Sequence, residues 1–191
     1  MSVFNKVDVP EGQSGEWKVS RFKPEGLFAE MHNIKYPRRQ LTIGDTYTKL
    51  THHGDVVMSD TPAELRDLRQ LGQNLRGRIL INGLGLGVAL QGALDEKEVY
   101  HVTVIELSRD VISLVGQHYM ARYGNKLLTI IHADAMDWIP PKGLRYNTVW
   151  HDIWPTICGD NYESMKKLHR KYGKRCNWQG SWCKKEVKNA Q

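Results

Sequence analysis

The chain has no run of about 20 apolar residues, the length that a bilayer-spanning helix requires. Segment 1–6 lacks the apolar core of a secretory signal peptide. Only three cysteines occur among 191 residues, and no two of them are spaced as a CxxC pair. This scarcity argues against a disulfide framework and against a finger-like zinc site. We therefore expect no membrane span, no metal site and reduced thiols in a cytoplasmic protein.

Acidic residues are outnumbered, with 21 aspartates and glutamates against 27 lysines and arginines, for a formal net charge of +6. Many of the basic residues fall in segment 166–188. Such a run is typical of a solvated helix face, although clustered cations also suit the phosphates of a nucleic acid. The charge therefore leaves a nucleic-acid partner open without favouring it.

Prolines and glycines recur through the first 40 positions, which predicts a loop-rich arm with short strands. Segments 41–50 and 55–58 have strand character and are separated by polar turn residues, a pattern that predicts a β-hairpin. We expect residues 1–60 to form this N-terminal arm and hairpin, and residues 61–191 to form the main domain.

Strand and helix patterns alternate through the main domain. Strands are predicted over residues 78–82, 102–106, 127–132, 146–152 and 177–183. Helices are predicted over residues 62–75, 86–94, 108–122 and 162–172, with a short helical turn at 135–139. Repeated units of this length indicate an α/β fold, a parallel sheet with helices on both faces.

Three alternate glycines, Gly83, Gly85 and Gly87, follow the apolar strand predicted over residues 78–82. Glycines at such a place let the backbone turn tightly and approach a ligand closely. The dinucleotide fingerprint requires a third small residue, but that position is Val88 or Leu90 in the two frames available. The spacing is instead typical of class I methyltransferase-like folds that bind S-adenosylmethionine or its relatives.

Acidic residues end the next three strands. Glu106 is placed to accept hydrogen bonds from both ribose hydroxyls of a nucleoside. Asp134 is placed to accept one from the adenine amine, while Leu107 and Ala135 offer apolar faces to the ring. Asp152 ends the fourth strand and is expected to point into the same crevice, because the carboxyl ends of parallel strands share one sheet edge.

Segments 79–87, 104–112, 134–139 and 151–155 together resemble spermidine synthase-like proteins of the class I S-adenosylmethionine-dependent methyltransferase superfamily. The resemblance implies a Rossmann-like fold and S-adenosylmethionine or its decarboxylated form as cofactor. It implies that the three glycines cradle the amino-acid or aminopropyl end of the cofactor, and that Asp152 corresponds to the acid that deprotonates an attacking amine.

The antiparallel hairpin that closes this fold is missing after residue 183, so the sequence predicts a C-terminus that is truncated relative to the family. Part of the acceptor pocket would then be absent or supplied by a second subunit of a homo-oligomer.

Three functions stay open. The first is an enzyme that transfers a methyl or aminopropyl group to a small acceptor. The second is a degenerate cofactor-binding or scaffold protein, because segment 58–61 lacks the family's Tyr-His-Glu sequence. The third, a nucleic-acid methyltransferase, is less favoured, because Asp152 is followed by Ile-Trp-Pro rather than by Pro-Pro and an aromatic residue.

Overall fold

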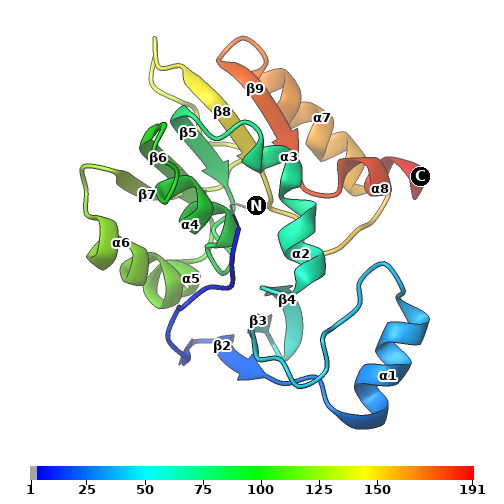
Figure 1. Cartoon of the computed structure of the whole chain (residues 1–191). Coiled ribbons are helices and arrows are strands. Elements are labelled where there is room, and N and C mark those ends of the chain that lie inside the picture. Colours follow the sequence, from blue (N-terminus) through cyan, green and yellow to red (C-terminus); the bar gives the residue numbers. More distant parts are fainter. Residues whose placement is uncertain (1–3) are drawn as a thin grey trace.

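A computed structural model describes residues 4–191, which form two β-sheets and the helices packed around them (Figure 1). The smaller sheet is antiparallel and has the strand order β1-β2-β3-β4. Its strands are β1 (Gly12–Ser14), β2 (Trp17–Phe22), β3 (Tyr47–His52) and β4 (Asp55–Ser59). The larger sheet has five strands in the order β7-β6-β5-β8-β9. These are β5 (Gly77–Asn82), β6 (Val99–Glu106), β7 (Leu128–His132), β8 (Tyr146–His151) and β9 (Cys176–Ser181).

Every strand pairing of the larger sheet is parallel, which confirms the predicted α/β fold. The first strand of this sheet in the sequence, β5, lies at its centre. Strands β6 and β7 follow on one side of β5, and strands β8 and β9 follow on the other. This reversal opens a crevice at the carboxyl ends of β5 and β8, the usual ligand site of such sheets. No antiparallel strand joins this sheet within residues 4–191.

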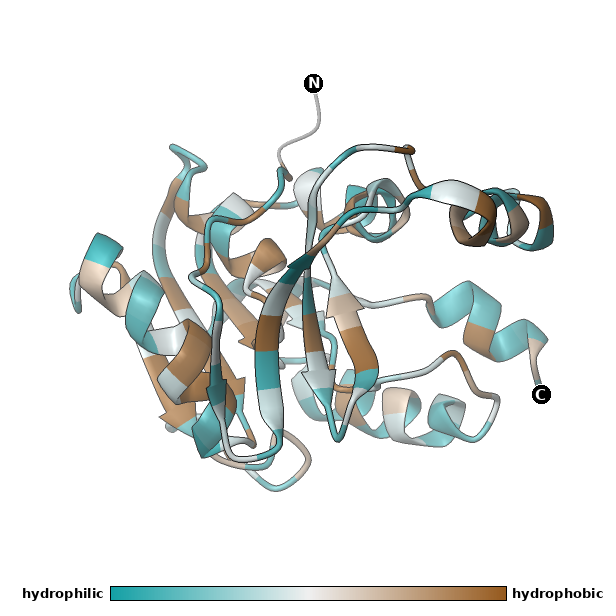
Figure 2. Ribbon diagram, turned by 90° about the horizontal axis from the view of Figure 1, so that it is seen from below, coloured by the Kyte–Doolittle hydropathy of each residue, from teal (hydrophilic) through white to brown (hydrophobic). Residues whose placement is uncertain are grey.

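Strand β5 is apolar over residues 79–81 because both faces of the sheet are covered there. Ile79 and Ile81 belong to a buried cluster on one face, and Leu80 belongs to a second cluster on the other. This alternation follows from the two-residue period of a strand. Figure 2 shows hydrophobic residues along these strands and more hydrophilic ones on the helices around them.

The predicted helices of the main domain are present, with altered bounds. They are α2 (Pro62–Asp67), α3 (Arg69–Gly72), α4 (Val88–Leu94), α5 (Arg109–Val111), α6 (Gln117–Tyr123) and α7 (Asn161–Tyr172). The helix predicted over 62–75 breaks at Leu68, and α5 continues into α6 through a π-helical segment, Ile112–Gly116. Segment 135–139 forms one hydrogen-bonded turn and no helix, with the Trp138 amide bonded to the Asp134 carbonyl.

Two helices lie where none was predicted, α1 (Gly26–Lys35) and α8 (Lys184–Asn189). Helix α1 has apolar residues at helical spacing, but prolines and glycines around it suggested loops. Most of these apolar side chains are exposed, namely Leu27, Phe28, Met31 and Ile34.

The strand predicted over 41–50 was wrong in its first half, because Gly44 has a φ of +79° and the Asp45 amide closes a turn on the Thr42 carbonyl. The β3–β4 hairpin itself is confirmed.

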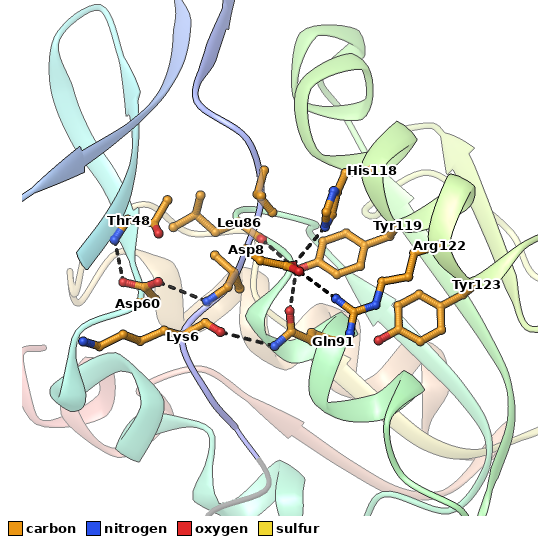
Figure 3. Close-up of polar contacts among 12 residues, drawn as sticks. Lys6, Asp8, Thr48, Asp60, Leu86, Gln91, His118, Tyr119, Arg122 and Tyr123 are labelled. Carbon is orange, nitrogen blue, oxygen red and sulfur yellow. Dashed lines mark hydrogen bonds and ion pairs between the residues drawn. The ribbon is translucent and has the colours of Figure 1, made fainter. Parts of the chain in front are cut away.

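An N-terminal segment connects the two sheets (Figure 3). Asp60, just after β4, accepts hydrogen bonds from the Val7 amide at 3.1 Å and the Thr48 amide at 2.7 Å. Asp8 forms an ion pair of 2.9 Å with Arg122 on α6. The smaller sheet is thereby held against the carboxyl edge of the larger one, while the division of the chain at residue 60 stays a prediction.

Candidate cofactor and acceptor site

A cavity of about 420 Å³ lies at the carboxyl ends of β5, β6, β7 and β8, beneath the β3–β4 hairpin. All the predicted site residues except Gly87 line it: Gly83, Gly85, Glu106, Leu107, Asp134, Ala135 and Asp152. The fold brings together residues that lie up to 69 positions apart in the chain, because each one follows a strand of the same parallel sheet.

The turn after β5 has two glycines with positive φ that border the cavity, and the first of them meets another part of the backbone. Gly83 has a φ of +94°, and a Cβ placed on it would lie 1.9 Å from the carbonyl oxygen of Asp152. Gly85 has a φ of +53°, and a Cβ there would lie 2.4 Å from the Sδ of Met58. Both positions border the cavity, so the backbone of this turn forms part of its wall and packs closely against Asp152 and Met58.

Gly87 has a different role. It precedes α4 with a φ of +78°, and a Cβ there would lie 2.2 Å from the ring of Tyr119. Gly87 does not border the cavity. The close packing of α4 against α6 explains this glycine, and its contact with a cofactor stays a prediction.

Glu106 is buried at the end of β6 with its carboxylate fixed by two backbone amides. Its Oε2 accepts a hydrogen bond from the Leu84 amide at 2.8 Å, and its Oε1 accepts one from the Ser108 amide at 2.7 Å. A carboxylate offers about four acceptor sites, so each oxygen keeps one for a ligand. This geometry fits the two adjacent hydroxyls of a ribose.

The loop after β7 forms a second part of the cavity wall. Asp134 accepts a hydrogen bond from the Met136 amide at 2.7 Å through Oδ1. Lys171 on α7 donates to the carbonyl oxygens of Ala135 and Met136, at 3.0 and 2.9 Å, and so fixes the loop. Ala135 is buried and Leu107 is 66% exposed, and both line the cavity with apolar side chains.

Asp152 and Glu64 place two carboxyl groups in the cavity. Burial, together with the negative charges of Glu64 and Asp67, raises the pKa of Asp152 to about 7. Burial also raises the pKa of Glu64. Its carboxylate accepts hydrogen bonds from the Ser59 backbone amide at 3.0 Å and the Ser59 hydroxyl at 2.8 Å, which lower the pKa but do not offset the effect of burial. Asp152 therefore titrates near neutral pH, as a group that accepts and releases protons must.

Behind Asp152, a buried histidine connects the ends of three strands. The side-chain amide of Asn82 donates through Nδ2 to Nδ1 of His151 at 2.8 Å, and Nε2 of His151 lies 3.2 Å from Oε1 of Gln179. Burial lowers the pKa of His151 to about 3, so the ring is neutral. An accepting Nδ1 leaves the proton on Nε2, which donates to Gln179. The network fixes the strand ends that carry Gly83 and Asp152.

Aromatic residues that were not predicted from the sequence form the outer wall. The rings of Trp17 and His52 stack at 4.3 Å with an interplanar angle of 18°, and both come from the smaller sheet. Trp154 and Trp182 line the cavity from the loops after β8 and β9. The alternation of side chains between the two faces of β2 and β3 could have indicated that Trp17 and His52 share a face of the smaller sheet. It could not have indicated that this face borders the cavity.

No group of three or more histidine, cysteine, aspartate or glutamate side chains within residues 4–191 is placed to hold a metal ion. In the same part of the chain, no helix has the length and apolar character needed to cross a membrane. Cys158 is exposed and Cys176 and Cys183 are buried, and all three are free thiols.

No family model matches the chain, and neither does any curated protein. Among solved structures it is similar to a candidate RNA methyltransferase from Pyrococcus horikoshii, with 16% identity over 62% of this chain and 56% of the other and a TM-score of 0.48. It is also similar to a SAM-dependent methyltransferase from Thiobacillus denitrificans in complex with S-adenosyl-L-homocysteine (23% identity, 58% and 44% covered, TM-score 0.42). A third is a candidate caffeoyl-CoA O-methyltransferase from Staphylococcus aureus (17% identity, 79% and 62% covered, TM-score 0.45). The chain spans less than two thirds of the length of each of these proteins.

Proposed function

We propose that the protein is a transferase that uses S-adenosylmethionine, or its decarboxylated form, to move a methyl or aminopropyl group to a small acceptor. One observation carries the proposal: the glycine turn, Glu106 and Asp134 follow three different strands yet line one cavity of about 420 Å³. Pockets of this size suit a nucleoside-sized ligand with one further small group. The spermidine synthase-like resemblance of the sequence agrees with it.

The hydrogen-bond acceptors and apolar side chains of the cavity fit an adenosine ligand. Glu106 would accept hydrogen bonds from the ribose hydroxyls, and Asp134 from the adenine amine, with Leu107 and Ala135 against the ring. Gly83 and Gly85 line the cavity with backbone, and the chain that bears the sulfur would lie against this turn.

When bound, S-adenosylmethionine supplies an electrophilic carbon on a positively charged sulfur. Asp152 would hold the acceptor beside that carbon and take the proton that the attacking atom loses. A pKa of about 7 leaves the group partly ionised at neutral pH, which suits this role. Trp17, His52 and Trp154 would exclude water from the acceptor.

Calorimetry tests the proposal directly. The protein is titrated with S-adenosylmethionine, its decarboxylated form and S-adenosylhomocysteine, with cytidine as an unrelated nucleoside. We expect micromolar binding of at least one sulfur compound and weaker binding of cytidine. Asp134→Asn replaces an acceptor by a donor and should weaken binding about tenfold, whereas Asp137→Asn, on an exposed neighbour outside the cavity, should not.

Absence of binding by all three sulfur compounds would refute the proposal. Binding without turnover on amine, nucleotide or protein acceptors would instead favour a degenerate cofactor-binding protein. The preferred donor, methyl or aminopropyl, is identified by which of the two sulfonium compounds binds more tightly.

A further inference from the structure

A second hollow, of about 640 Å³, lies between α2, α3, α7, α8 and the end of β9. Its charged lining is mostly basic: Arg66, Arg69, Lys184, Lys185 and Lys188, against Asp67 and Glu186. We call it the basic hollow. Its three lysines belong to the C-terminal run whose pattern is typical of a solvated face, but the fold brings them opposite arginines about 115 residues earlier in the chain.

The positive charge of the basic hollow is not balanced. None of its five lysines and arginines forms an ion pair with a carboxylate of residues 4–191. Asp67 is already paired with Arg39, outside the hollow, at 2.9 Å. The only other carboxylate among the described lining residues is Glu186, so a net positive field remains inside a concave surface, where low-dielectric walls focus it.

Lys184 shows the imbalance most clearly. Its Nζ lies 3.3 and 3.4 Å from the two ring nitrogens of His169. Burial, together with the charge of Lys184, lowers the pKa of His169 to about 4, so the ring is neutral and gives no counter-charge. Burial lowers the pKa of Lys184 as well. A partly buried ammonium without an anion is costly, and a bound anion would remove that cost.

The basic hollow adjoins the cofactor cavity. Helix α2 lines both, since Glu64 faces the cavity and Arg66 and Asp67 face the hollow. The connection from β9 to α8 does the same through the consecutive residues Trp182 and Cys183. The hollow and the cavity that contains Asp152 are therefore neighbours that share α2 and the β9–α8 connection as walls.

We propose that the basic hollow binds a phosphate group carried by the acceptor. Arginine offers a planar fork that matches phosphate oxygens and lysine a compact charge, and the hollow provides both on facing elements. The acceptor half of this inference rests on the proposed function, whereas the phosphate site does not. The ligand is a phosphate ester, either a monoester or a diester.

Binding of two probes tests the site: a fluorescein-labelled single-stranded oligonucleotide, followed by polarisation, and adenosine 5′-monophosphate as its competitor. The test variant is Arg69→Gln/Lys185→Gln, because both side chains are exposed and have no ion-pair partner among the described residues. The matched control is Lys97→Gln/Lys142→Gln, which removes the same charge from exposed positions at the amino edge of the larger sheet.

We expect the hollow variant to weaken oligonucleotide binding at least tenfold and the control less than twofold. Competition by the monophosphate at a concentration comparable to the oligonucleotide's dissociation constant identifies a monoester ligand. A diester ligand is identified by two results together. The monophosphate fails to compete, and the slope of the logarithm of the oligonucleotide binding constant against the logarithm of the salt concentration falls in magnitude by about 1.4 in the variant.

Equal losses in the two variants would show long-range attraction only, and unchanged affinity in the hollow variant would show that no site exists. Either result overturns the inference. Phosphate binding at the hollow with no binding of any sulfur compound would refute the proposed function and the acceptor role, and would leave a phosphate site alone. Binding of the sulfur compounds with no phosphate binding would refute only the inference.

Discussion

The Glu106 carboxylate lies 2.8 Å from the backbone amide of Leu84, so the acid that ends β6 holds the glycine turn after β5. The second oxygen holds the Ser108 amide in the same way. The group proposed to bind the ribose therefore also fixes the backbone that forms the neighbouring cavity wall. Loss of its charge should affect the cofactor site and the stability of the fold together.

Glu106→Gln tests this double role. A glutamine can turn its oxygen to only one of the two amides and must present its NH₂ to the other, which leaves two donors facing each other. A hydrogen bond to a charged group contributes about 1.5–3 kcal/mol. We expect S-adenosylhomocysteine to bind roughly 10- to 100-fold more weakly and the melting temperature to fall. Glu98→Gln, on an exposed residue, is the control, and equal behaviour of the two variants would contradict the assignment.

Gly83→Ala should be far more destabilising than its backbone strain alone explains. The added Cβ would lie 1.9 Å from the carbonyl oxygen of Asp152. This oxygen is a backbone atom directly after β8, so it can move only if the end of that strand shifts. Gly143→Ala is the matched control, because Gly143 has a similar φ of +82° but no atom within 4 Å of the new Cβ.

We expect a loss of roughly 3–5 kcal/mol in the free energy of unfolding for Gly83→Ala and about 1 kcal/mol for Gly143→Ala. Urea denaturation of the two variants measures both values. Similar losses would mean that the clash is relieved at little cost and that the turn tolerates a side chain.

The inner wall of the site could be predicted from the sequence because its determinants are local. A buried parallel strand is a continuous apolar run, and the residues directly after it must lie at the carboxyl edge of the sheet. Gly83, Glu106, Asp134 and Asp152 all satisfy this rule. The packing of Gly87 against Tyr119, a partner 32 positions away, is not revealed by the local pattern, and the cofactor contact of Gly87 stays a prediction.

The outer wall could not be predicted for a related reason. Trp17 and His52 reach the cavity because the smaller sheet crosses the carboxyl edge of the larger one, and no local pattern encodes that placement. Glu64 lies in the first turn of α2, where an acidic residue is expected for the helix dipole alone, so its position in the sequence does not indicate a cavity residue. The basic hollow depends on the approach of α2 and α3 to α8, a helix that was not predicted at all.

Asp152 should titrate near neutral pH in the folded protein. We expect its carboxyl ¹³C resonance to report a pKa of about 7. Glu64→Gln should lower that value, because it removes a like charge. If an acceptor is found, kcat/KM should rise with pH through the same range, and Asp152→Asn should reduce it at least about 100-fold. A resonance that titrates near 4 would rule out Asp152 as a base at neutral pH.

His151 and Asp152, adjacent in the chain, should shift the stability of the protein with pH in opposite directions. The folded pKa of His151, about 3, lies below its unfolded value of 6.5. The stability it contributes is present above pH 6.5 and is lost as the pH falls toward 3, because the unfolded chain then binds a proton that the folded one does not. The folded pKa of Asp152, about 7, lies above its unfolded value of 3.8. Its contribution is present below pH 3.8 and is lost as the pH rises through 7.

In the wild type these two slopes largely cancel between pH 4 and 6.5, and the variants separate them. Relative to the wild type, His151→Asn should gain about 1.4 kcal/mol in the free energy of unfolding for each unit that the pH falls within this range, and Asp152→Asn should lose the same amount. Asparagine at 151 keeps an acceptor for the Asn82 amide, so the variant should remain folded. Denaturation curves at half-unit pH steps measure the slopes. Parallel curves for wild type and both variants would show that neither side chain is held in its neutral form by burial.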